Sequence, residues 1–167
     1  MDPIIARIFA FVLGMLALAG VAYGGYEGYQ WYRSNTIVEG ITMMQTNIAG
    51  LYAQSGAGYG SLTTANAPAL INQNVFPPSW VRGGNTLIDP WGNAVALASG
   101  GNATQGVITI GGGGSQNVET CSRVVMGLSN YVSLAVGNQT FTKNAAPDPV
   151  AAGAACDGQP TISVTFQ

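Results

Sequence analysis

The first fifty residues carry two hydrophobic patterns, one after the other. Residues 8–26 are 19 positions without a charge, close to the length that an α-helix needs to cross a bilayer. Five apolar residues then recur at spacings of four and three, namely Ile37, Ile41, Met44, Ile48 and Leu51. Such spacing places them on one stripe of an amphipathic helix. Because no proline interrupts residues 5–67, the sequence predicts one long helix from about Pro3 to Ala53. Its second half should pack on a domain through the stripe.

The charge-free segment is typical of a retained membrane helix. Aromatic residues collect at its downstream end, at Tyr23, Tyr26, Tyr29, Trp31 and Tyr32. Aromatic side chains are enriched where a helix leaves the hydrocarbon. The segment has one preceding arginine and no small-x-small cleavage site before a soluble start, so it differs from a secretory signal peptide. A buried core helix is the alternative interpretation.

Glycines recur on one face of this segment, at Gly20, Gly24 and Gly28, with Gly14 further upstream. Small residues at this spacing let helices approach closely within a membrane or a bundle. Each glycine also weakens a helix by about 1 kcal/mol relative to alanine. The face therefore indicates either helix packing or local unwinding, unless it reflects only the general frequency of glycine in membrane helices.

The remainder of the chain, residues 54–167, predicts one globular domain after the helical region of residues 1–53. Short β-branched or alternating runs predict strands at Val95–Ala98, Val107–Ile110 and Thr161–Phe166. A helix is expected between the last two, capped by Ser115 or Asn117. Its apolar positions are Val118, Cys121, Val125, Leu128, Val132 and Ala135. The predicted fold class is α+β, with a mainly antiparallel sheet lying on the long helix. We expect the glycine run 111–114 to be a flexible connection, since it lacks the Gly-Lys-Ser/Thr ending of a phosphate loop.

Composition excludes several classes of function. Charged residues make up 7% of the 167 residues, the net charge is −2 and histidine is absent. A basic nucleic-acid-binding surface is therefore not expected, and histidine-based catalysis is impossible. Asp89 and Glu119 are isolated in the sequence, which gives no support for an acid–base pair, and Asp89 with Asn93 is too little for a calcium site. We expect no metal, no cofactor and no enzymatic activity.

Two cysteines, Cys121 and Cys156, are the only ones in the chain. If the domain faces an oxidising compartment, as the membrane anchor suggests, a disulfide between them is expected. Two buried free thiols are the alternative.

Several short motifs lie along this frame: Leu51-Tyr52, Gly58-Tyr-Gly-Ser-Leu62 followed by Thr63, Asp89-Pro-Trp-Gly-Asn93, and the two cysteines. Together with the apolar helix that becomes amphipathic, they resemble type IVb pilins, in particular the thin-pilus subunits of conjugative plasmids and related enteric pili. Asp-Pro-Trp-Gly-Asn is also similar to the major pseudopilin of type II secretion, which generally lacks the disulfide-bounded C-terminal region. A membrane-anchored periplasmic binding module is a further alternative.

The resemblance implies a structural subunit, the major pilin. Before assembly, the subunit would be anchored in the inner membrane of a Gram-negative bacterium. It would then polymerise through its helix into an extracellular pilus, and this pilus would be used for conjugation, adhesion or aggregation. Its partners would be identical pilins, a prepilin peptidase, an assembly ATPase and a secretin. Loops 57–81 and 140–155 would set what the fibre touches.

The sequence departs from the family at Ile5, where pilins usually carry a glutamate. The nearby charges are Asp2 and Arg7, and we expect one of them to make contacts between subunits. We also expect Met1 to be the residue that the prepilin peptidase exposes. The residues expected to act in the filament core are therefore Met1, Asp2, Arg7, Gly14, Gly20, Gly24 and Gly28.

Overall fold

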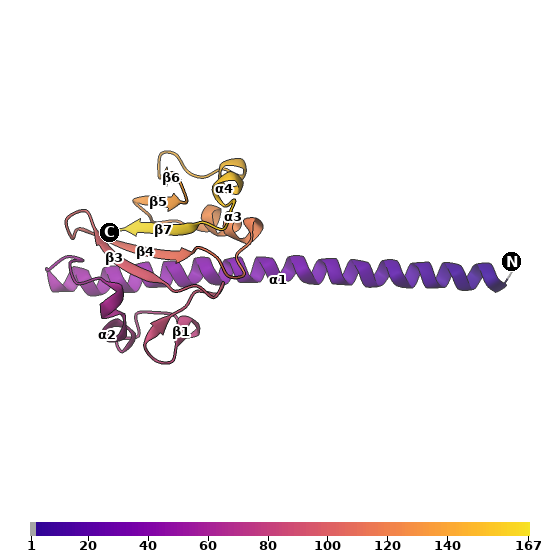
Figure 1. Cartoon of the computed structure of the whole chain (residues 1–167), viewed down its shortest axis with the longest axis horizontal. Coiled ribbons are helices and arrows are strands. Elements are labelled where there is room, and N and C mark those ends of the chain that lie inside the picture. Colours follow the sequence, from indigo (N-terminus) through magenta and orange to yellow (C-terminus); the bar gives the residue numbers. More distant parts are fainter. Residues whose placement is uncertain (1–2) are drawn as a thin grey trace. The chain divides into compact units, whose positions relative to one another are not determined.

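The computed structural model describes residues 3–167, except for the side chains of residues 3–8, 10, 23, 27 and 55. The chain divides into two compact units, residues 1–32 and residues 33–167. Helix α1 (Pro3–Ser55) runs from the first unit into the second, which confirms the long N-terminal helix (Figure 1). The division thus falls within α1, because the helix from Arg33 onward belongs to the second unit, called the head below.

The head contains a five-stranded sheet in which every neighbouring pair is antiparallel. The strands are β3 (Ala96–Gly100), β4 (Gln105–Gly111), β5 (Ser133–Val136), β6 (Gln139–Thr142) and β7 (Thr161–Phe166). Their order is β3-β4-β7-β5-β6, so the last strand in the sequence is the central one. In the ribbon of Figure 1, β7 lies between β4 and β5.

Alternation along the strands determines which side of the sheet is buried. In β7 and β4 every second residue is buried, and the register pairs Ile108 with Val164 and Ile110 with Ile162. These side chains form one hydrophobic core with the stripe of α1. On the other face, the Thr109 and Ser163 hydroxyls lie 2.8 Å apart across the same two strands. The alternation of hydrophobic and polar residues along β4 and β7 therefore gives the sheet one face in the core and one polar face.

Shorter elements cover the rest of the core. Along the chain, α1 is followed by η1 (Thr64–Asn66), α2 (Ala67–Ile71), η2 (Pro78–Trp80) and a small hairpin of β1 (Val81–Arg82) and β2 (Thr86–Leu87), and the five-stranded sheet begins after them. Helix α3 (Val118–Gly127) follows β4, and α4 (Pro149–Ala155) precedes β7. Asn117 caps α3 by accepting a hydrogen bond from the Thr120 N–H, as one of the two proposed caps predicted.

The predicted extent of α3 was wrong. The helix ends at Gly127, and Leu128 is already extended, with φ −69° and ψ 137°. Asn130 then has a positive φ of 59°, and Ala135 lies in β5, paired with Ser163 of β7. Pairing with the central strand therefore overrides the helical spacing that the apolar residues happen to share.

Candidate assembly surfaces

The anchor segment, defined here as residues 9–32, exposes most of its apolar side chains. Its large hydrophobic residues from Phe9 to Val21 are each 48–75% exposed, namely Phe9, Phe11, Val12, Leu13, Met15, Leu16, Leu18 and Val21. Exposed contiguous apolar surface marks a site that meets protein or membrane. Phe11–Gln54 is the one helical stretch among the described residues that is long and apolar enough to cross a membrane, by length and composition. The predicted contacts of Met1, Asp2 and Arg7 fall outside the described residues and side chains.

Glycines in the anchor segment are not required by anything in the subunit. A Cβ added at any of them would meet no atom within 4 Å beyond the local helix backbone; they are Gly14, Gly20, Gly24, Gly25 and Gly28. Helix α1 is continuous through all of them. The glycine at position 40 is different, because its Cβ would lie 2.8 Å from Trp80 Cζ2. The head thus explains Gly40, whereas the subunit alone gives no reason for the glycines of the anchor segment.

The stripe of α1 lies in the core of the head. Ile37, Ile41, Met44 and Ile48 are fully buried. The fifth member, Leu51, is only partly buried and packs at the edge of that core. It lines two neighbouring surface hollows between the end of α1 and α2, each of about 380 Å³. Burial of four large side chains at about 1.5–3 kcal/mol each is what holds this half of α1 on the sheet.

A buried carboxylate organises the loop of the Asp-Pro-Trp-Gly-Asn motif. Asp89 Oδ1 accepts hydrogen bonds from the backbone N–H groups of Trp91 (2.9 Å) and Asn93 (2.8 Å). Its Oδ2 accepts one from the N–H of Gly111 (2.8 Å), at the end of β4. Asp89 therefore closes its own turn and fastens that turn to the central part of the sheet. This explains the motif structurally, with no chemistry assigned to the carboxylate.

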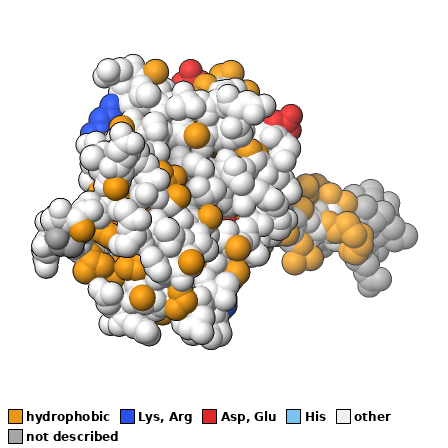
Figure 2. Space-filling model, turned by 60° about the vertical axis from the view of Figure 1, so that its left-hand side comes forward, with side chains coloured by type: hydrophobic (Ala, Val, Ile, Leu, Met, Phe, Trp, Pro, Cys, Tyr) orange, Lys and Arg blue, Asp and Glu red, His pale blue; other side chains and the backbone are white. Residues whose placement is uncertain are grey.

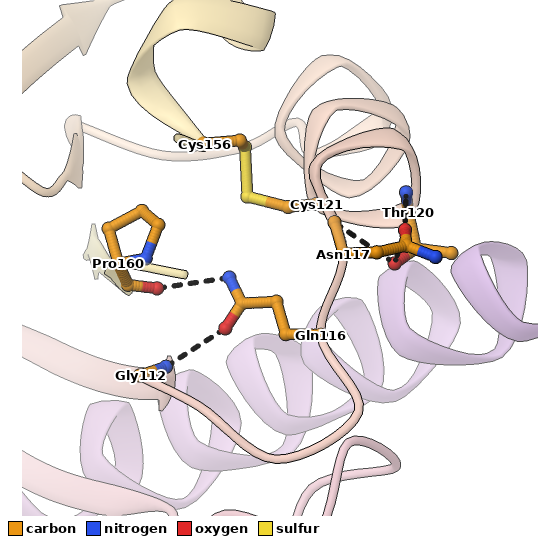
Figure 3. The surroundings of a disulfide bond; sticks show 7 residues. All are labelled: Gly112, Gln116, Asn117, Thr120, Cys121, Cys156 and Pro160. Carbon is orange, nitrogen blue, oxygen red and sulfur yellow. Dashed lines mark hydrogen bonds between the residues drawn. A yellow bond between two sulfur atoms is a disulfide. The ribbon is translucent and has the colours of Figure 1, made fainter. Parts of the chain in front are cut away.

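The glycine run at the end of β4 forms the expected connection from a strand to a helix, here β4 to α3. All four residues from Gly111 to Gly114 have positive φ, a region that side chains disfavour. A Cβ at Gly114 would also lie 2.2 Å from the Trp91 carbonyl oxygen. Gln116 fixes the turn from inside, as its Oε1 accepts from Gly112 N–H (3.0 Å) and its Nε2 donates to the Pro160 carbonyl (3.0 Å). Figure 3 shows this glutamine between the two backbone groups.

The disulfide between Cys121 and Cys156 is present, as predicted. It joins α3 to the C-terminal cap of α4, with the two Cα atoms 5.8 Å apart (Figure 3). Both residues are buried. The bond closes a loop of 35 residues that contains β5, β6 and α4 and returns the chain to β7.

The surface of the head carries few charges. Figure 2 shows a face made mostly of uncharged polar side chains and backbone, with scattered hydrophobic groups and few charged ones. Among the described residues no group of three or more His, Cys, Asp or Glu side chains could hold a metal ion. Burial raises the pKa of the Tyr59 hydroxyl above its ordinary value of 10.0.

Sequence reasoning missed two residues that tie the head together. Arg33 donates to the Pro90 carbonyl and to the Ser115 hydroxyl, so it connects α1 to both loops beside Asp89. Trp80 packs its indole ring against Gly40. Neither belongs to a recognisable motif, although a lone glycine in the amphipathic half of α1 could have indicated a close contact.

Comparisons with known proteins agree with this architecture. The sequence model of a family described as PilS N terminal matches residues 31–167. Among solved structures, the crystal structure of TcpA, a type IV pilin from Vibrio cholerae El Tor biotype, is similar, with a TM-score of 0.55 and 13% identity. The match covers 81% of this chain and 99% of the TcpA chain. At this identity the likeness shows the fold. No curated protein matches the sequence. With most of its length matched by the family model and the fold of TcpA in its structure, the chain belongs to the PilS family of type IV pilins.

Proposed function

We propose that this pilin is the major subunit of a type IVb pilus, anchored in the inner membrane of a Gram-negative bacterium and then polymerised into an extracellular filament. The observation that carries the proposal is the difference between the two halves of α1. From Ile37 to Ile48 the stripe is buried in the head, while the anchor segment exposes its apolar side chains. A surface of that kind must be covered by lipid or by other subunits.

The glycines of the anchor segment support polymerisation through this helix. Within the subunit they cost helix stability, about 1 kcal/mol each, and meet no neighbour. We propose that they act outside the isolated subunit, either in close packing of helices or in local unwinding within the filament. Exchange of lipid for identical helices keeps the apolar surface away from water, so extraction from the membrane exposes little hydrocarbon. A repeated contact of this heterologous kind generates an open helical fibre.

We propose a structural and not an enzymatic role for the subunit. Both cysteines are joined in the disulfide, and the Asp89 carboxylate is occupied by backbone N–H groups. The partners would be identical pilins, a prepilin peptidase, an assembly ATPase and a secretin, and direct nucleic-acid binding is not part of the proposal. Conjugation, adhesion and aggregation are the uses to be distinguished by recipient and adherence assays on cells with and without the fibre.

Substitution of one glycine in each half of α1 tests the proposal. Gly24→Val adds a branched side chain to the anchor segment, and Gly50→Val is the matched control because its Cβ also meets no atom within 4 Å. We expect Gly24→Val to abolish fibres in negative-stain images while the membrane level of the subunit stays the same. Gly50→Val should keep fibres. Normal fibres with Gly24→Val would refute the role of this face, and absence of fibres in the unmodified protein with its assembly genes would refute the pilus itself.

The charges near the N-terminus are tested separately. We propose that Asp2 or Arg7 makes a charge contact between subunits where the family usually has a glutamate at position 5. If Asp2→Ala and Arg7→Ala both assemble at the level of the unmodified protein, this part of the proposal fails without affecting the rest.

A further inference from the structure

The connection from α4 to the central strand β7 contains an Asp-Gly pair, Asp157-Gly158. The peptide nitrogen after an aspartate can attack the side-chain carboxyl group and close a five-membered succinimide ring, and glycine obstructs this attack least. The remaining aspartates, Asp2, Asp89 and Asp148, each precede a proline, whose nitrogen carries no proton to lose. No asparagine, which would react in the same way, is followed by glycine. The sequence therefore favours ring closure at Asp157 above every other position.

Both residues of the pair are exposed and free of the contacts that would oppose ring closure. The carboxylates of Asp89 and Asp148 accept hydrogen bonds from backbone N–H groups. Among the described residues, neither the Asp157 carboxylate nor the Gly158 N–H has a hydrogen-bond partner. Gly158 has a φ of 74°, and a Cβ built on it would meet no atom within 4 Å beyond its chain neighbours. The attacking nitrogen and the space beside it are thus both available.

We propose that Asp157 is a site of spontaneous modification, at which aspartate converts to isoaspartate while the head stays folded. In the first step the Gly158 nitrogen bonds to the Asp157 side-chain carbonyl carbon, and the amide proton leaves with the carboxyl hydroxyl as water. In the second step water opens the ring at the main-chain carbonyl, so the chain then continues through the side-chain carbon. The water released in the first step is consumed in the second, and no oxidant, cofactor or enzyme is required. The product carries a free α-carboxylate, the group that isoaspartyl methyltransferases methylate.

Isoaspartate at Asp157 lengthens a connection that is fixed at both ends. On one side, Cys156 is held in the disulfide. On the other side, the Pro160 carbonyl accepts hydrogen bonds from the Gly112 N–H (3.2 Å) and from Gln116 Nε2 (3.0 Å), the second of which is drawn in Figure 3. The modification adds a main-chain carbon between these points, immediately before the strand at the centre of the sheet. We expect the modified head to loosen the contacts of Pro160 and to be less stable than the unmodified head.

Ageing of the full chain in detergent micelles tests the proposal. Folded protein and urea-unfolded protein are incubated side by side at physiological temperature. Isoaspartate is quantified with an isoaspartyl methyltransferase and labelled S-adenosylmethionine, and it is located by electron-transfer mass spectrometry. The variants are Asp157→Glu, which would need a less favourable six-membered ring, and Gly158→Asn, because asparagine tolerates the left-handed backbone while its side chain obstructs the attack. Asp89 and Asp148 are internal controls in every sample, and urea unfolding compares the stability of fresh and aged protein.

We expect isoaspartate to accumulate at Asp157 in the folded protein, and not at Asp89 or Asp148. Gly158→Asn should reduce it severalfold, and Asp157→Glu should abolish it. Because the protonated carboxyl group reacts, accumulation should be faster at mildly acidic than at alkaline pH, the opposite of asparagine deamidation. Absence of isoaspartate from the folded protein would overturn the inference, including when the unfolded chain forms it. An unchanged urea midpoint of the modified protein would overturn the expected loosening at Pro160. These outcomes do not bear on the proposed function, because the reaction needs only the folded head.

Discussion

Replacement of Asp89 by asparagine should destabilise the head by about 2–4 kcal/mol. The asparagine Oδ1 can still accept from the Trp91 and Asn93 N–H groups. Its NH₂ group, however, replaces the carboxylate oxygen that lies 2.8 Å from the Gly111 nitrogen in the unmodified protein, so two donors face each other there. The hydrogen bond from the Gly111 N–H to a charged acceptor, about 1.5–3 kcal/mol, is lost and that N–H is left unpaired. The long contact from Asn93 Nδ2 to the same oxygen (3.5 Å) is lost with it. The opposite amide orientation loses two bonds, so it offers no escape.

Urea unfolding of the full chain in detergent micelles, followed by the fluorescence of the buried tryptophans, measures this loss. Asp157→Asn is the control, since Asp157 is exposed and surface substitutions usually change stability by less than about 0.5 kcal/mol. The reasoning is refuted if Asp89→Asn falls within that same margin, because the carboxylate would then not be what closes the loop.

Three further changes test other contacts in the same urea assay. Gly40→Ala should cost about 0–2 kcal/mol, because crowding against Trp80 at 2.8 Å costs about 1–3 kcal/mol and the better helix propensity of alanine returns about 1 kcal/mol. A variant more stable than the unmodified protein would contradict the close packing. Replacing Cys121 and Cys156 together by serine should cost about 4 kcal/mol for a loop of 35 residues, and an unchanged midpoint would show that the bond constrains nothing. Burial raises the pKa of Tyr59 in the folded protein above 10.0, so Tyr59 ionises at lower pH in the unfolded chain, and the free energy of unfolding should fall as pH rises above about 10. Tyr59→Phe should reduce this loss of stability at alkaline pH. Identical pH profiles of the two proteins would argue against the effect of burial on Tyr59.

Regular patterns in the sequence were enough to predict the frame of the fold. Helix α1 within the head and strand β7 each bury one face. Hydrophobic residues therefore recur with the period of the element, and this period can be recognised in the sequence. The disulfide followed from the presence of only two cysteines and the expected oxidising compartment. These predictions needed only local periodicity and composition.

Contacts that depend on tertiary structure were not predictable in this way. The apolar spacing from Val118 continues into Ala135, and only the pairing of β5 with β7 decides that the helix stops at Gly127. The close approach of the Trp91 carbonyl to Gly114 likewise joins two loops that are distant in the sequence, and composition does not reveal it. The role of Arg33 likewise requires knowing that residues 57 and 82 positions away are its neighbours.

The place of β7 has a consequence for biogenesis. The hairpin of β3 and β4 and the hairpin of β5 and β6 are joined in the sheet only through β7, although β7 is the last of these strands to be synthesised and to cross the membrane. A nascent head therefore cannot complete its sheet from either hairpin alone, and non-local pairing of this kind is slow. Truncation before Thr161 would leave two separate hairpins with unpaired edges, which proteases and chaperones recognise. The five-stranded sheet is therefore complete only when the last strand in the sequence has paired on both sides.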